Sequence, residues 1–322
     1  MNTAPRVSII MPAYKSAPFM DIAIQPAFAQ TEQDFELIIV DDFSPDDTRD
    51  VIERFAASDA RIRPIYLDTN GGAAAALNRA TDAARGRWVA LLDSDDWYSP
   101  TRLRRLLNAG EAAGVDMVAD NQCVFDLKAG RMVGTVFPRG GDRKIGIETF
   151  LAETDPTAAF DLGMLKPVFR TEFIRKHQVE YREYARHGYD YWVLLDYFRT
   201  GGVALLVDEP LYYYVQPFGT FSREWAQEGR MRYPFAHIKA MNDRVVAELR
   251  SSVPPTVTPG QLSLLKRRGR KMAALEGFAQ LGEHLRAHKP FAALRAIATS
   301  PAAFWPLAAS RGFDFARRTL ST

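Results

Sequence analysis

Alternating strand and helix patterns fill the first 120 residues of this 322-residue chain and limit the folds that it can adopt. Short apolar runs typical of buried strands alternate with segments whose apolar residues recur at helical spacing. This rhythm predicts a doubly wound α/β domain, a mostly parallel sheet with helices on both faces. The expected strands are 7–11, 36–41, 62–67, 88–93 and 115–119, and the expected helices begin near 44, 72 and 99.

The remainder of the chain is less regular. We expect a helix over 189–200 and two short strands, 204–207 and 211–215, on either side of a proline turn. The Ser- and Pro-rich run 251–255 is typical of a linker. The predicted parts are an α/β half over 1–120, its continuation over 121–250 and a helical extension over 251–322.

Charge is distributed unevenly along the chain. The net charge of +2 gives no global field that would favour nucleic acid. Residues 260–322, however, hold 11 Lys or Arg against 3 Asp or Glu, and five of the cations lie within 266–271. The cations are not interleaved with stacking aromatics, which also argues against nucleic acid.

An apolar stripe follows this basic cluster. Two interpretations stay open: a basic amphipathic segment on an anionic membrane surface, or a helical cap that packs on the α/β domain and has a solvated basic face. The stripe comprises Met272, Leu275, Phe278, Ala279, Leu281 and Leu285, and then Phe291, Leu294, Ile297, Phe304 and Trp305.

The expected compartment is the cytoplasm. Cys123 is the sole cysteine, so the chain cannot form an internal disulfide, and a reducing environment is the simple interpretation. The first apolar run, 7–11, is too short for a signal peptide, and no run approaches the roughly 20 apolar residues that span a bilayer. Any membrane contact would therefore be peripheral, on the inner face.

Polar clusters follow three of the predicted strands. Ligands of open parallel sheets bind beyond the carboxyl ends of the strands, so the fold should gather these clusters along one edge. The clusters are Pro12-Ala13-Tyr14 after the first strand, Asp41-Asp42 after the second and Asp93-Ser94-Asp95-Asp96 after the fourth.

Each cluster also has a purely structural interpretation. A tyrosine after a strand is more often packed than stacked on a base, and Asp41-Asp42 can serve a loop and a helix start. The acid run 93–96 is harder to explain in this way, because crowded carboxylates repel one another unless a cation offsets them. Such sites suit Mg²⁺ or Mn²⁺, which hold phosphates through one or two carboxylates. The chain has neither a G-x-G-x-x-G after its first strand nor a P-loop motif, which disfavours dehydrogenases and P-loop hydrolases.

Several ordered motifs resemble the family 2 glycosyltransferases of GT-A fold: VSIIMPAY (7–14), IIVDDFSPDDT (38–48), NGG (70–72) and LLDSDDW (91–97). The resemblance is close over the first 125 residues and looser in the central region. It implies inverting transfer of a sugar from a nucleotide-sugar donor, with UDP-sugars favoured, to a hydroxyl of a glycan or lipid-linked acceptor. Bacterial exopolysaccharide or another cell-surface glycan is the implied product.

The resemblance also implies a nucleotide site. Pro12 and Tyr14 would contact the nucleotide, with Tyr14 stacked on the base, and Asp42 would accept a hydrogen bond from the uracil N3–H. Asn78 matches the asparagine of the family's Ala-Arg-Asn helix motif, but Leu77 replaces the arginine. A phosphate-side arginine is therefore missing from this helix.

The acid run receives its roles from the same resemblance. Asp95 would face the ribose and the metal, Asp96 would hold the metal that bridges the diphosphate, and Asp93 would contact the nucleotide side and orient the run. Near 213–222 the family often has an arginine and a histidine. This chain has Val215-Gln216-Pro217 there, which leaves a histidine contact to the metal in doubt.

The segment HGYDYW (187–192) resembles the family's segment that carries the acceptor base, usually written Glu-Asp. Asp190 matches the Asp and would be the catalytic base, while Tyr189 replaces the Glu. Tyr189, Tyr191 and Trp192 would offer a flat surface to the acceptor sugar.

Alternatives to these assignments stay open. Asp190 could simply favour a helix N-terminus through the dipole, and Glu183 and Asp196 are the other candidate bases. Two other functions compete with glycosyl transfer. One is a non-catalytic nucleotide-sugar-binding scaffold of a membrane glycan-assembly complex, and the other is a metal-dependent phosphohydrolase.

Overall fold

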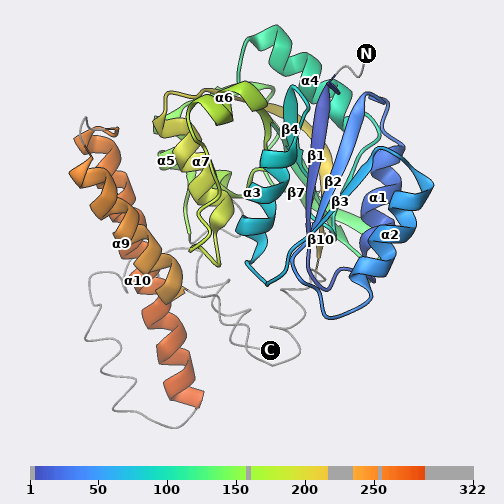
Figure 1. Ribbon diagram of the computed structural model, residues 1–322. Helices are drawn as coiled ribbons and strands as arrows, with labels where there is room; N and C mark the ends of the chain where they lie inside the picture. The colour runs from blue at the N-terminus through green and yellow to red at the C-terminus, as the bar shows by residue number, and fades with distance from the viewer. Residues whose placement is uncertain (1–3, 157–160, 217–234, 253–255, 287–322) are drawn as a thin grey trace. The chain divides into compact units, whose positions relative to one another are not determined.

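A mixed, mostly parallel sheet organises the larger of two units in the computed structural model, which describes residues 4–156, 161–216, 235–252 and 256–286 (Figure 1). The larger unit comprises residues 1–147 and 163–224, and the smaller comprises 148–162 and 225–322. This division differs from the expected one, because residues 148–162 and 225–250, expected within the α/β domain, belong to the smaller unit.

The strand order is β3-β2-β1-β4-β9-β6-β10-β5, with β7 paired to β6 and β8 to β10. β1 pairs in parallel with both β2 and β4, β2 with β3, and β6 with β10, so the predicted mostly parallel α/β class is confirmed. The strands are β1 (Val7–Ala13), β2 (Phe35–Asp41), β3 (Ile62–Tyr66), β4 (Trp88–Leu91), β5 (Trp97–Tyr98), β6 (Met117–Asp126), β7 (Arg131–Thr135), β8 (Arg143–Ile145), β9 (Val168–Arg170) and β10 (Ala204–Gln216).

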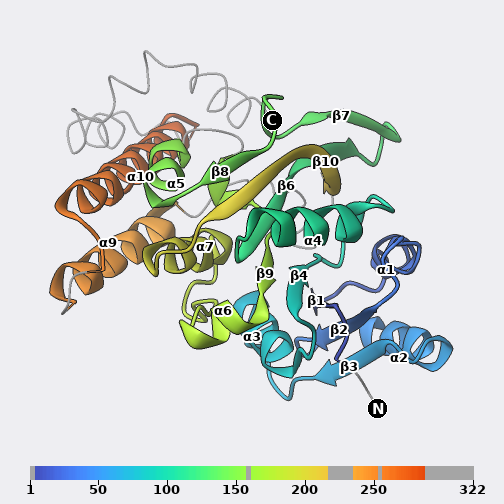
Figure 2. The ribbon, with the colours of Figure 1, turned by 90° about the horizontal axis from the view of Figure 1, so that it is seen from above.

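Helices cover both faces of this sheet (Figure 2). α1, α2 and α4 lie on one face, and α3, α6 and α7 lie on the other. Side chains alternate along β1, so Val7, Ile9 and Met11 join the main apolar core while Ile10 faces the opposite side. The helices of this unit are α1 (Met20–Phe28), α2 (Thr48–Ser58), α3 (Ala73–Ala83), α4 (Arg102–Ala113), α6 (Thr171–Lys176) and α7 (Tyr189–Arg199), with α5 (Ile147–Glu153) at its boundary and the 3₁₀ turn η1 (Leu162–Met164).

Two local predictions were wrong. The strands expected over 204–207 and 211–215 form the single strand β10, whose register shifts on either side of Pro210. Proline lacks the N–H that a ladder needs, and here the strand bulges at that point instead of turning back. α2 begins at Thr48 rather than near Ser44, because Ser44 and Asp46 serve the loop before it.

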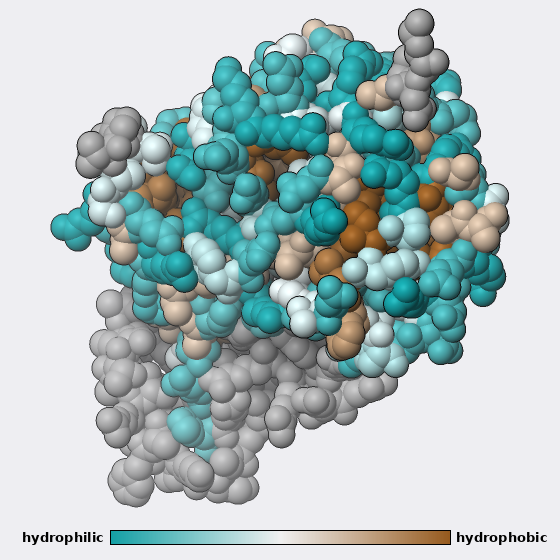
Figure 3. Space-filling model, in the orientation of Figure 1, coloured by the Kyte–Doolittle hydropathy of each residue, from teal (hydrophilic) through white to brown (hydrophobic). Residues whose placement is uncertain are grey.

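Polar residues cover most of the face drawn in Figure 3, where apolar side chains show in limited areas. Phe43 is one of the described large apolar residues with an exposed side chain, at 59% exposure. It directly follows the predicted nucleotide-binding Asp42.

In the smaller unit, α9 (Phe235–Ser251) packs against α10 (Pro259–Arg286). Phe235 and Ile238 of α9 share an apolar cluster with Met272 and Leu275 of α10. Part of the predicted apolar stripe therefore packs inside a helical pair.

The basic cluster lies within α10 and is only partly engaged. Arg268 pairs with Asp161 at 3.8 Å and Lys271 pairs with Asp155, whereas Lys266, Arg267 and Arg270 are exposed. No helix in the described part of the chain is long and apolar enough to cross a membrane. Peripheral binding to an anionic membrane stays a prediction. Phe291, Leu294, Ile297, Phe304, Trp305 and the side chains of Phe278, Ala279, Leu281 and Leu285 lie outside the described residues.

Candidate active site

Hydrogen bonds join the loops that follow β1, β2 and β4 into one edge of the sheet. The hydroxyl oxygens of Ser16 and Ser94 lie 2.8 Å apart, and the Ser16 N–H donates to Thr48 Oγ1 at 2.8 Å. The Lys15 N–H donates to Ser44 Oγ at 3.1 Å. The three polar clusters thus meet where the chain order reverses around β1, the place at which open α/β sheets bind ligands.

Tyr14 leaves the end of β1 with its ring partly exposed, and the Lys15 ammonium lies 5.3 Å from the ring centre. Pro12, also partly exposed, lies within β1 opposite Val40 of β2. Lys15 and Phe43 both have positive φ, at 52° and 58°. Backbone strain of this kind gathers at functional sites, and here it lies on both sides of the predicted base position.

Asp42 is 2% exposed, and its two carboxylate oxygens accept the N–H groups of Gly71 and Gly72, each at 2.7 Å. Burial raises the pKa of Asp42, while the two N–H donors and the Arg186 guanidinium oppose the rise. Asp42 therefore fixes the turn before α3, and its contact with uracil stays a prediction.

Arg186 is a candidate that the sequence analysis missed. Gly72 has φ 87°, and a Cβ on it would lie 2.8 Å from Arg186 Nη1, so glycine allows the guanidinium to come this close. A cation thus stands at the start of α3, although Leu77 replaces the arginine of the helix itself. Because Arg186 lies far from Gly72 in sequence, the local motif carries no signal for it.

Asn78 has a structural role in this arrangement. Its Nδ2 donates to the Tyr181 carbonyl and its Oδ1 accepts the Tyr181 N–H, both at 2.8 Å, and Nδ2 also reaches Glu183 Oε1 at 3.1 Å. The adjoining cavity of about 130 Å³ is smaller than the roughly 300 Å³ at which ligand pockets begin. Asn78 holds residues 181–183 in place, and its contact with nucleotide stays a prediction.

The acid run forms a tight turn after β4, closed by the Asp96 N–H donating to the Asp93 carbonyl at 3.2 Å. Asp96 is 1% exposed, and its carboxylate accepts the Tyr212 hydroxyl and the Val215 N–H, each at 2.8 Å. Burial and the neighbouring acids raise the pKa of Asp96 well above its ordinary value. Burial, together with the charge of Asp93, raises the pKa of Asp95 to about 6.

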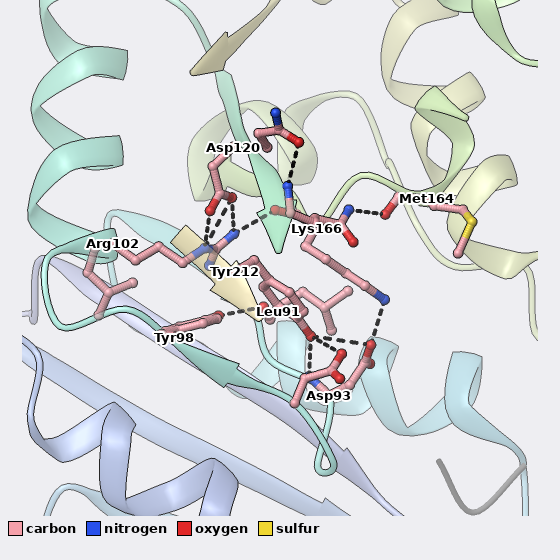
Figure 4. A network of polar contacts seen from close by, with 12 residues as sticks. Leu91, Asp93, Tyr98, Arg102, Asp120, Met164, Lys166 and Tyr212 are labelled. Carbon is pink, nitrogen blue, oxygen red and sulfur yellow. Dashed lines mark hydrogen bonds and ion pairs between the residues drawn. The ribbon is translucent and has the colours of Figure 1, made fainter. Parts of the chain in front are cut away.

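Lys166, which the sequence analysis also missed, pairs with Asp93 of this run (Figure 4) and also lies near the predicted base Asp190. Its Nζ lies 2.5 Å from Asp93 Oδ2 and 3.7 Å from Asp190 Oδ2. Asp190 lies in the first turn of α7. Burial raises the pKa of Asp190 to about 6, with Lys166 opposing the rise and Asp93 adding to it. The fold thus brings the predicted base next to the acid run.

The predicted acceptor surface needs a correction. Tyr191 is 3% exposed and Trp192 is 1% exposed, because nearly all of α7 after its first turn is buried. Neither ring can offer an open face to a sugar. Tyr189 is partly exposed and packs edge-on to Tyr181, with ring centres 6.2 Å apart, so its acceptor role stays a prediction.

The two alternative bases are already engaged. Asp196 accepts hydrogen bonds from Arg182 at 2.9 Å and from Arg199 at 2.5 Å. Glu183 is exposed and bound to Asn78. Of the three candidates, Asp190 is the carboxylate that shares a partner with the acid run.

A divalent cation at the acid run stays a prediction. No group of three or more Asp, Glu, His or Cys is arranged to hold a metal in the described part of the chain. Mg²⁺ and Mn²⁺, however, bind nucleotides through one or two carboxylates and the phosphates themselves. Burial and then the charge of Asp93 raise the pKa of Asp95, and Lys166 opposes this rise only in part.

Comparison with known proteins adds a family likeness. The family model described as Glycosyl transferase family 2 matches residues 8–166. Succinoglycan biosynthesis protein ExoO of Rhizobium meliloti is 34% identical over 227 residues, which cover 69% of this chain and 64% of ExoO. Putative teichuronic acid biosynthesis glycosyltransferase TuaG of Bacillus subtilis is 41% identical over 124 residues, 38% of this chain and 46% of TuaG. The chain thus spans less than two thirds of ExoO and less than half of TuaG.

Solved structures share the fold. The S. aureus TarS 1-349 structure in complex with UDP-GlcNAc superimposes with a TM-score of 0.57 at 15% identity, covering 92% of both chains. Mannosyltransferase PcManGT from Pyrobaculum calidifontis, in complex with GDP-Man and Mn²⁺, gives a TM-score of 0.58 at 18% identity, covering 99% of this chain and 86% of PcManGT. The expected GT-A-like architecture is confirmed at the level of the fold.

Proposed function

Because residues 8–166 match the model of glycosyl transferase family 2, we propose that the chain is an inverting glycosyltransferase that moves a sugar from a nucleotide-sugar to a hydroxyl of a glycan or lipid-linked glycan. One observation carries the proposal. A buried lysine lies between an acid run that follows β4 and a carboxylate on α7. The names of ExoO and TuaG favour a bacterial exopolysaccharide or other cell-surface glycan as the product.

The donor would lie along the edge formed by β1, β2 and β4. Tyr14 supplies a partly exposed ring for the base, and Asp42 is the proposed acceptor for uracil N3–H. This contact would favour UDP-sugars over adenine or cytosine nucleotides, since N3 of uracil carries a hydrogen that Asp42 can accept. One structural neighbour binds UDP-GlcNAc and another binds GDP-Man, so the neighbours do not decide between uracil and guanine nucleotides. The proposed preference for uracil therefore rests on Asp42.

Asp95 and Asp96 would hold Mg²⁺ or Mn²⁺ at the diphosphate. Such a cation offsets the charge that develops on the leaving diphosphate. Hydrogen bonds from Tyr212 and Val215 hold the Asp96 carboxylate in one orientation before any donor binds. Preorganised charges of this kind need no reorganisation during the reaction.

Asp190 would accept the proton of the acceptor hydroxyl as its oxygen attacks the anomeric carbon. Its pKa of about 6 leaves it ionised near neutral pH, yet more basic than an ordinary aspartate. The attacking oxygen forms the new glycosidic bond as the bond to the diphosphate breaks on the opposite side, which inverts the anomeric configuration.

Activity should fall as the pH drops through about 6. Asp190 must be ionised to accept a proton, and its raised pKa means that the protonated, inactive form accumulates below that value. We expect kcat to decline about tenfold per pH unit on this limb. Initial rates should be measured at two Mn²⁺ concentrations, because a limb set by the metal-binding Asp95 would move with metal and one set by Asp190 would not. A flat profile down to about pH 5 would contradict this role.

Removing the Arg186 guanidinium should weaken donor binding. Arg186→Ala is expected to raise the donor KM about tenfold, because a charge-assisted hydrogen bond to a phosphate is worth about 1.5–3 kcal/mol. The kcat should change less than about threefold, since the contact is made equally in ground and transition states. Arg131→Ala, on the exposed strand β7, is the matched control. An unchanged donor KM would exclude Arg186 from the donor site.

Release of the nucleoside diphosphate tests the proposal. UDP-sugars and GDP-sugars are supplied with Mn²⁺, each with and without a pool of glycan acceptors. A transferase releases nucleotide faster when acceptor is present. A non-catalytic scaffold would be stabilised against unfolding by the donor but would release no nucleotide. A phosphohydrolase would cleave the donor at the same rate with or without acceptor.

A further inference from the structure

Lys166 has an unusual position for a lysine. Its side chain is 6% exposed, and its ammonium group lies between carboxylates from two distant elements, Asp93 after β4 and Asp190 on α7. Burial disfavours the ammonium form, but Asp93, Asp190 and Asp96 together raise the pKa of Lys166 well above its ordinary value. The side chain is therefore a buried cation, and breaking such a pair is costly.

A buried polar network holds the backbone of Lys166 in place (Figure 4). Arg102 and Asp120 are both 0% exposed and form a bidentate pair, with Arg102 Nη2 2.8 Å from Asp120 Oδ1. The same Nη2 donates to the Lys166 carbonyl at 2.8 Å. Gln122 Nε2 donates to the Met164 carbonyl at 2.7 Å, two residues earlier. The segment that carries Lys166 is thus anchored to β6 and α4.

Tyr212 holds the acid run that faces the Lys166 ammonium. Its hydroxyl donates to Asp96 at 2.8 Å and accepts the Asp93 N–H at 3.2 Å. Its ring lies beside both cations, with its centre 5.8 Å from Lys166 Nζ and 5.1 Å from Arg102 Cζ. A residue that merely neutralised charge would not need its backbone and its side chain fixed by separate buried contacts.

We propose that Lys166 is a positioning residue that fixes the Asp190 carboxylate relative to the donor site through Asp93. The inference rests on the proposed function, since Asp190 is a base only if the chain transfers a sugar. The ammonium fixes the orientation of the carboxylate, and proximity of this kind decides how efficiently a base meets the hydroxyl proton. Lys166 itself contacts neither donor nor acceptor in this account.

The ion pair between Lys166 and Asp190 also influences the pKa of Asp190. The charged and titratable groups that face Asp190 are Lys166, Asp93, Tyr181 and Tyr189. Among them the ammonium group favours the ionised carboxylate, whereas burial and Asp93 oppose it. Removal of the ammonium group should therefore raise the pKa of Asp190 above its value of about 6.

Lys166→Met, which keeps the length of the side chain and removes its charge, tests the inference. We expect kcat to fall at least about 30-fold, the donor KM to change less than about threefold, and the acid limb of the kcat profile to rise by about one pH unit. Lys144→Met, an exposed position on β8, is the matched control. A kcat within about threefold of wild type, with an unmoved acid limb, would overturn the positioning role.

A titration independent of activity separates this inference from the proposed function. The carboxyl ¹³C signal of Asp190 is assigned with Asp190→Asn and followed against pH in the wild type, Lys166→Met and Lys166→Arg. The Met variant should titrate higher than wild type, and the Arg variant, which keeps a cation, should titrate close to wild type. An equal pKa in the Met variant and wild type would refute the inference. A wild type that transfers no sugar would refute only the proposed function. If Lys166→Met unfolds, Lys166→Gln is titrated and judged in the same way.

Discussion

Replacement of Asp190 by asparagine is expected to lower kcat at least about 100-fold and to leave donor affinity nearly unchanged. The asparagine keeps the shape of the side chain in the first turn of α7 but cannot accept the hydroxyl proton. The lost interaction belongs to the transition state, so the effect should appear in kcat and not in KM. Steady-state kinetics with varied donor, together with calorimetric titration of UDP, measure the two quantities separately.

Glu183→Gln is the matched control for this substitution. Glu183 is exposed and bound to Asn78, so loss of its charge should leave kcat within about threefold of wild type. Near-normal kcat in Asp190→Asn would move the base to another residue. A collapse of UDP affinity in that variant would instead assign Asp190 to the donor site.

Asp96→Asn should reduce transfer by about 10³-fold or more, since a cation at the diphosphate contributes several kcal/mol of transition-state stabilisation. Asparagine fits the same space between Tyr212 and Val215 but lacks the charge that would hold the cation. UDP binding in Mn²⁺ should weaken together with kcat. Removal of the metal with EDTA should produce the same loss in the wild type.

Tyr212→Phe separates the effect of the Asp96 charge from the effect of the hydroxyl that orients it. It removes the hydroxyl that donates to Asp96 at 2.8 Å and leaves the charge in place, so we expect a smaller loss than for Asp96→Asn. Thermal unfolding of both variants shows whether the turn is intact. The metal role would be wrong if Asp96→Asn stayed active and the wild type bound UDP equally well in EDTA.

The sheet and its polar edge follow from local sequence rules. Apolar runs such as 7–11 and 88–93 pack on both faces, which selects a parallel sheet covered by helices. Carboxyl ends of parallel strands meet at one edge, so Tyr14, Asp42 and the acid run could be grouped without coordinates. The hydrogen bond between Ser16 and Ser94 directly links the loop after β1 with the acid run after β4.

Contacts between distant segments could not be predicted in this way. Lys166 and Arg186 reach the site from segments whose local pattern shows no periodicity or motif that points to it. Aromatic residues beside an acid suit a sugar, so the sequence predicts an acceptor surface at Tyr191 and Trp192. Both side chains are buried, because other segments cover α7 on nearly every side. The cover comes from tertiary packing, which a helical period alone does not reveal.

The anomeric configuration of the product tests the central claim most directly. The full chain is incubated with an α-linked UDP-hexose, Mn²⁺ and a glycan acceptor, and the purified product is examined by ¹H NMR, with Asp190→Asn as the blank. We predict one sugar added in β linkage, from the three-bond coupling of its anomeric proton, and no product from the blank. A product in α linkage, or free hexose formed equally by both proteins, would contradict the account.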